Sequence, residues 1–148
     1  MFKPWSTSQR LLLLVTLLLY VLSFPLTAFT YEYQGTKTMA GYTAFLMGGV
    51  AFLGGGAEEW LLWMANPLFM LSIFWLARKK INLSLAGSIV AVLTALSFLL
   101  VETVLAAESG SRGAIESRGP GYYLWLSGMI ALLVTVAWMK ATDIRMKL

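Results

Sequence analysis

The chain has 148 residues, of which 59% are hydrophobic and only 12% are charged, and its net charge is +4. An ordinary soluble domain is roughly 45–50% apolar and about 25% charged, so this composition indicates an integral membrane protein. The sequence contains no cysteine and no histidine, which excludes disulfides, imidazole catalysis and metal sites built from those two ligands. We expect a single transmembrane domain over residues 1–148, because no polar stretch approaches the ~50 residues of a small soluble domain.

The first predicted span covers residues 11–29, a run without a charged residue that follows a short basic segment. Its polar side chains share one helical face, because they recur at spacings of four, three and four residues: Thr16, Tyr20, Ser23 and Thr27. We expect this face to pack against neighbouring helices. Residues 30–40 follow as a polar connector whose tyrosines suit a membrane interface.

Residues 41–56 form a glycine-rich apolar run that decides the topology of everything after it. A helix of this length reaches ~24 Å, which is short of the ~30 Å hydrocarbon core of a bilayer. If the run does not cross, eight of the eleven basic residues lie on the inner side of the membrane; if it crosses, only four do. The positive-inside rule therefore predicts that residues 41–56 form an interfacial or re-entrant helix on the outer face.

The second predicted span covers residues 60–77 and ends against three consecutive basic residues. Pro67 lies near its middle and leaves the backbone carbonyl of Trp63 without its usual donor. We expect the Asn66 amide to bond to backbone groups at this kink or to another helix, because polar side chains at membrane depth need partners. Four residues of this region fall on one helical face: Glu59, Trp63, Asn66 and Met70.

The third and fourth predicted spans cover residues 81–107 and 122–139, joined by a flexible loop over residues 108–121. Glu102 lies about 32 Å along the third helix from its start, which places it at the outer boundary of the membrane. Small residues at helical spacing give the third span a face that allows close helix packing: Ser84, Ser88, Ala91 and Ala95. Three aromatic residues anchor the outer end of the fourth span: Tyr122, Tyr123 and Trp125.

Two short motifs stand out in this pattern. Trp63-Met-Ala-Asn-Pro67 lies in the second span behind the glycine-rich run, and Gly119-Pro-Gly-Tyr-Tyr-Leu-Trp125 enters the fourth span. Both resemble motifs of a loose group of small bacterial four-span membrane proteins, and the resemblance covers roughly residues 41–140. It implies a four-span architecture in a bacterial membrane. The group has no assigned activity, so the resemblance carries no catalytic residue over.

Together these elements predict an all-α fold, an integral membrane four-helix bundle with an additional interfacial or re-entrant helix on its outer face. We expect any functional site at the outer rim, where residues 41–56 would roof a shallow cavity that Glu59 and Glu102 face. The alternative is that the glutamates are only flank charges that pair with Lys37, Arg112 or Arg118. The candidate residues of the rim are Glu58, Glu59, Glu102, Asn66, Tyr122, Tyr123 and Trp125.

The favoured function is an interaction or assembly component that self-associates or docks into a larger membrane complex through its small-residue faces. The alternative is a small oligomeric channel or carrier with a path lined by the glycine-rich segment and Asn66. We expect no enzyme, cofactor or metal, because the sequence shows no nucleotide loop, nucleophile–base pair or metal-ligand cluster. The expected partners are the lipid bilayer and a second copy or another membrane protein, with no nucleic acid. The expected location is the bacterial cytoplasmic (inner) membrane, with both termini cytoplasmic.

Overall fold

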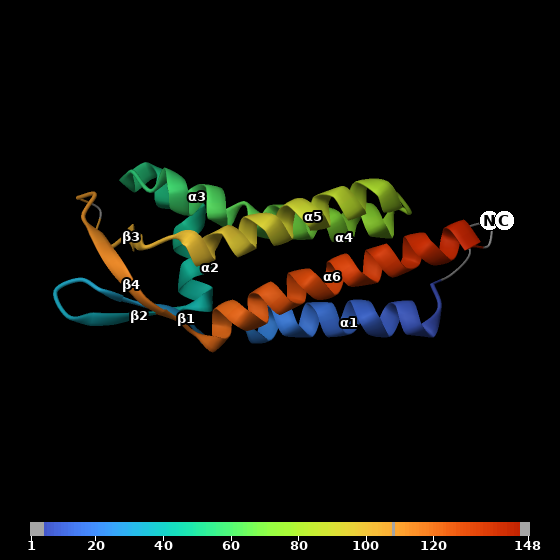
Figure 1. Cartoon of the computed structure of the whole chain (residues 1–148), viewed down its shortest axis with the longest axis horizontal. Helices are drawn as coiled ribbons and strands as arrows, with labels where there is room; N and C mark the ends of the chain where they lie inside the picture. The colour runs from blue at the N-terminus through green and yellow to red at the C-terminus, as the bar shows by residue number, and fades with distance from the viewer. Residues whose placement is uncertain (1–4, 108, 146–148) are drawn as a thin grey trace.

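The computed structural model describes residues 5–107 and 109–145. Long helices lie side by side along its longest axis, and a small β-sheet lies beyond one end of them (Figure 1). The elements in chain order are α1 (Thr7–Leu22), β1 (Thr27–Glu32), β2 (Thr36–Ala40), α2 (Gly41–Val50), the 3₁₀ turn η1 (Ala51–Gly54), α3 (Ala57–Trp63), α4 (Ala65–Ala77), α5 (Ile81–Ser97), the 3₁₀ turn η2 (Phe98–Leu100), β3 (Thr103–Leu105), β4 (Arg112–Arg118) and α6 (Pro120–Arg145).

The β-sheet contradicts the prediction of an all-α four-helix bundle. Within the described residues it has four antiparallel strands in the order β2-β1-β4-β3. Its strands come from the end of the first predicted span, the polar connector, the end of the third predicted span and the predicted flexible loop. Gln34 and Gly35 have φ values of 53° and 106° at the tip of the β1–β2 hairpin. Threonine and tyrosine residues, which favour strands, flank that turn, and these signals indicate a hairpin.

One arginine links the sheet to the end of α5 and η2. β1 and β4 are the central strands, and the Thr30 and Ser117 hydroxyls lie 2.8 Å apart across them. Arg118, the last residue of β4, donates through Nη2 to backbone carbonyls at the end of α5 and η2, including those of Phe98 and Val101. A cation is favourable there because the carbonyls at a helix C-terminus carry partial negative charge. The same arginine therefore ends a strand and caps a helix.

Among the described residues, three helical stretches are long and apolar enough to cross a membrane: Ala57–Ala77, Ile81–Leu100 and Pro120–Thr142. The first of these consists of α3 and α4, which meet at Met64. α1 and the stretch Gly41–Gly54 are apolar but shorter. The first predicted span was therefore too long, because its last residues begin β1. The third was too long as well, because η2 ends at Leu100 and β3 follows.

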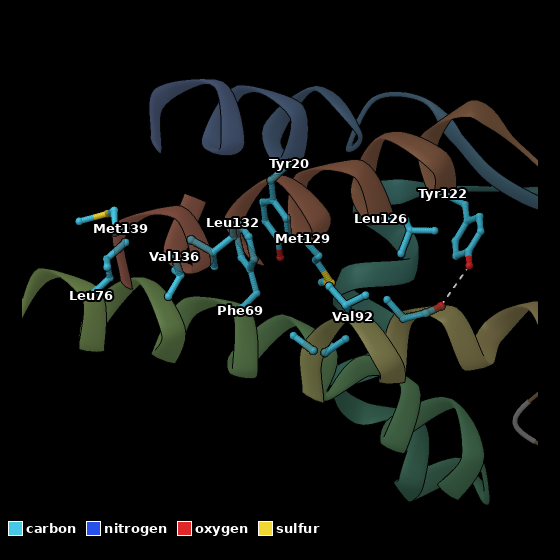
Figure 2. Packing of buried hydrophobic residues seen from close by; sticks show 13 residues of the cluster. Tyr20, Phe69, Leu76, Val92, Tyr122, Leu126, Met129, Leu132, Val136 and Met139 are labelled. Atoms are coloured by element: carbon cyan, nitrogen blue, oxygen red, sulfur yellow. Dashed lines mark hydrogen bonds between the residues drawn. The ribbon is translucent and has the colours of Figure 1, made fainter. Parts of the chain in front are cut away.

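The main core lies between α6 on one side and α4 and α5 on the other (Figure 2). Met129, Leu132 and Val136 point from α6 into this core, and each is almost fully buried. Tyr20 reaches from α1 to stack on Phe69 of α4, with ring centroids 4.6 Å apart. The predicted small-residue face is confirmed, since all four of its members are at most 1% exposed: Ser84, Ser88, Ala91 and Ala95.

Candidate functional site

A cavity of about 810 Å³ lies where the sheet meets the ends of the helices. α2 runs across the long axis of the molecule at this level and connects the sheet side to α3 (Figure 1). Residues of α2, η1, α3, the strands β1 and β3, and the first turns of α6 line the cavity. Eight aromatic side chains contribute to its wall: Phe24, Phe29, Tyr31, Phe45, Trp63, Phe98, Tyr122 and Trp125. Its volume is in the range of small-molecule binding sites.

α2 is held over the cavity by Trp63, the first residue of the Trp-x-Ala-Asn-Pro motif. The indole Nε1 donates to the backbone carbonyl of Phe45 at 2.7 Å. The ring lies against Gly48 and Gly49, and a Cβ atom at Gly48 would approach Trp63 Cδ1 to 2.8 Å. The paired glycines therefore provide the flat surface on which the indole ring packs. The run before the motif is rich in glycine because α2, which that run forms, must approach Trp63 closely.

Asn66 is a hydrogen-bonding centre between three helices. Its Nδ2 donates to the Trp63 carbonyl at 3.0 Å, the group that Pro67 leaves without a backbone donor. Its Oδ1 accepts from the Tyr20 hydroxyl of α1 and from the Trp125 indole of α6, both at 2.8 Å. Both roles expected of the Asn66 amide, at the kink and toward another helix, are therefore confirmed. α1, α4 and α6 meet at this one side chain.

The motif at the start of α6 is shaped by close backbone approaches. A Cβ atom at Gly119 would meet the carbonyl oxygen of Thr27, and one at Gly121 would lie 2.7 Å from that of Leu26. The Tyr122 hydroxyl donates to the Ala95 carbonyl at 3.0 Å (Figure 2). Trp125 then reaches Asn66. The two motifs identified in the sequence therefore contact each other in the cavity wall, through the hydrogen bond from Trp125 to Asn66.

Glu59 is the acidic residue of the cavity. Its Oε1 accepts from the Leu105 amide at 2.8 Å and from Arg112 Nη2 at 3.0 Å. Its Oε2 is buried and has no hydrogen-bond partner among the described residues. Arg112 also pairs with Glu58 at 3.0 Å, but the Glu58 side chain is 56% exposed whereas that of Glu59 is 14% exposed. Solvent therefore screens the Glu58 pair more strongly than the Glu59 pair, whose arginine is 35% exposed.

The structure brings four of the seven candidate residues together at the cavity: Glu59, Asn66, Tyr122 and Trp125. The other three are exposed and do not line it: Glu58, Glu102 and Tyr123. The prediction that Glu59 and Glu102 face the same cavity is therefore wrong, because Glu102 does not line it. Of the three expected basic partners only Arg112 pairs with a glutamate within the described residues.

The wall contributed by the sheet was not predicted from the sequence. Phe29, Tyr31 and Val104 come from strands and line the cavity, although their segments were assigned to spans and a connector. Buried and exposed residues alternate over only a few positions in β1, β3 and β4. The sequence pattern of these segments therefore did not indicate strands. The turn at Gln34–Gly35 was the one local signal for this wall.

The fold and the site together define a class of protein, in which helices of membrane-spanning length end at an antiparallel sheet over an aromatic cavity. No protein-family model, no curated protein and no solved structure matches this chain. Among the described residues, no group of three or more acidic side chains is placed to hold a metal ion. The chemistry of the cavity is therefore argued from its own residues.

Proposed function

We propose that this chain is a membrane protein that binds a small apolar molecule in the cavity beneath α2. The observation that carries the proposal is the wall itself, which combines eight aromatic side chains with a few polar groups, chiefly Glu59 and Asn66. Small-molecule sites have this composition, because the apolar wall supplies most of the binding free energy and the polar groups fix orientation. An apolar molecule would reach such a site from the surrounding lipid.

The orientation in a bacterial cytoplasmic membrane is supported by the distribution of basic residues. Arg78–Lys80 lie in the turn between α4 and α5, at the end of the helices opposite the sheet (Figure 1). The positive-inside rule places that end in the cytoplasm and the cavity on the outer side. Lys3 and Lys147, which are among the eight basic residues assigned to the inner side, lie outside the described residues. In intact cells, Ser109→Cys should react with an impermeant maleimide and Lys80→Cys should not; the reverse labelling would refute this orientation.

The two functions proposed from the sequence have less support. The small-residue face of α5 is buried within the chain, so it is not available to bind a second copy or a larger complex. The Asn66 oxygen already accepts two hydrogen bonds and its amide donates to Trp63. A side chain engaged in this way holds helices together and does not favour a conducting path. Assembly and transport both stay predictions.

Filling the cavity should abolish binding of a neutral apolar fluorophore. We expect N-phenyl-1-naphthylamine to show saturable energy transfer from the tryptophans of the protein, of which Trp63 and Trp125 line the cavity, when the protein is held in lipid nanodiscs. Ala44→Phe adds a ring to the cavity wall and should weaken this binding at least tenfold. Leu46→Phe adds a similar bulk at an exposed position of the same helix, outside the wall, and should change it less than twofold.

Signal from empty nanodiscs gives the partition background for this titration. If the wild-type signal rises only in proportion to that background, no site exists and the proposed function is wrong. Equal binding by Ala44→Phe and wild type would place the fluorophore somewhere other than this cavity.

A further inference from the structure

The charge of the cavity wall restricts what it can bind. Among the described residues that line the cavity, Glu59 is the one charged side chain, and no lysine or arginine is among them. Glu58 and Glu59 share a single cation, Arg112. The cluster therefore carries one more negative than positive charge, and the more buried of its carboxylates faces the apolar cavity.

One oxygen of that carboxylate lacks a donor. Glu59 Oε1 has two donors, whereas the buried Oε2 has none among the described residues. Buried polar atoms are nearly always hydrogen-bonded, so an exception of this kind marks a position where a donor is expected. Gly56 packs closely against this oxygen, because a Cβ atom there would lie 2.9 Å from Oε2.

Resting on the proposed function, we propose that the cavity selects amphiphiles that carry a protonated amine. The ammonium group would pair with the Glu59 carboxylate and supply the positive charge that the cluster lacks. The alkyl or aromatic part would lie among Phe45, Trp63 and Trp125. Aromatic faces also attract cations, which adds to the preference. A carboxylate or phosphate group would be rejected, because it would place a second negative charge beside a carboxylate in an apolar wall.

Three ligands of equal chain length test this selectivity: decylamine, decanol and decanoate. Each ligand is titrated against N-phenyl-1-naphthylamine bound to the protein in nanodiscs, and the displacement of the fluorophore is measured. Ligand concentrations are corrected for partition into empty nanodiscs. On the wild-type protein we expect decylamine to displace the fluorophore at least tenfold more effectively than decanol, and decanoate to be the weakest. A charge-assisted hydrogen bond is stronger than a neutral one, which sets this order.

Glu59→Gln should reduce the decylamine affinity at least tenfold and leave decanol within twofold of wild type, since glutamine keeps an oxygen that accepts from the Leu105 amide. Glu102→Gln is the matched control and should change neither, because Glu102 is exposed, does not line the cavity and does not pair with Arg112. The ligand order on the wild-type protein needs no variant, so it decides the question even if Glu59→Gln does not fold. Equal displacement by all three ligands would overturn the amine preference and leave the proposed function standing. Absence of any saturable fluorophore binding would instead refute the proposed function.

Discussion

Replacing Asn66 by alanine should lower the free energy of unfolding by about 3–5 kcal/mol. The change removes the acceptor of two donors, and it leaves the buried Tyr20 hydroxyl and the partly buried Trp125 indole without a partner. It also removes the donor that serves the Trp63 carbonyl at the proline kink. Unfolding in mixed micelles of mild detergent and dodecyl sulfate, followed by tryptophan fluorescence, measures the effect.

Tyr20→Phe is the control for this prediction, because it removes one of the three hydrogen bonds and keeps the stacking on Phe69. Its expected cost is about 0.5–1.5 kcal/mol. If Asn66→Ala costs no more than Tyr20→Phe, the Asn66 side chain does not organise the contact between α1, α4 and α6.

Gly119→Ala should cost about 3 kcal/mol or more, because the new methyl group has no space. The Cβ atom would meet the carbonyl oxygen of Thr27, a backbone atom that cannot rotate away. The Gly119 amide also donates to the Ala28 carbonyl at 2.8 Å, so the two backbones cannot separate without losing a hydrogen bond. The expected consequence is that β1 moves away from the start of α6, and the variant loses both stability and fluorophore binding.

Gly54→Ala is the matched control, because its Cβ atom would meet only Leu105 Cδ2, at 3.3 Å. That methyl group ends a flexible side chain, so we expect a change within about 0.5 kcal/mol. Both variants add one methyl group to a glycine near the cavity. Equal loss of stability in the two would show that the close approach of Gly119 to Thr27 is not a constraint on the fold.

Local features of the sequence predicted the helical part of the site well. Pro67 implied a free carbonyl at Trp63, and the Asn66 amide bonds to it. Helical spacing placed Glu59, Trp63 and Asn66 on one face, and all three line the cavity. Met70, assigned to the same face, is 45% exposed. Asn66 and Met70 lie one turn apart in the same helix α4, so helical spacing alone does not show where along the helix the buried face ends.

The sheet was not predictable in the same way, because strand pairing joins distant parts of the chain. Thr30 contacts Ser117 across 87 residues, and nothing local to either residue specifies that pair. Glu102 was misplaced for a related reason. Its expected depth assumed a helix that continues to residue 107, whereas α5 ends at Ser97 and the chain turns into β3. The residues of the cavity that the sequence missed are those that the sheet contributes.

Photolabelling tests the binding of an apolar molecule in the cavity most directly. Membranes containing the protein are irradiated with a neutral long-chain alcohol that carries a diazirine in its chain, and the adducts are mapped by mass spectrometry. We predict saturable adducts in peptides covering residues 41–54 and 121–125, which decrease with excess decanol and are lost in Ala44→Phe. Adducts confined to outward-facing residues such as Leu93, unchanged by decanol or by Ala44→Phe, would contradict binding of an apolar molecule in this cavity.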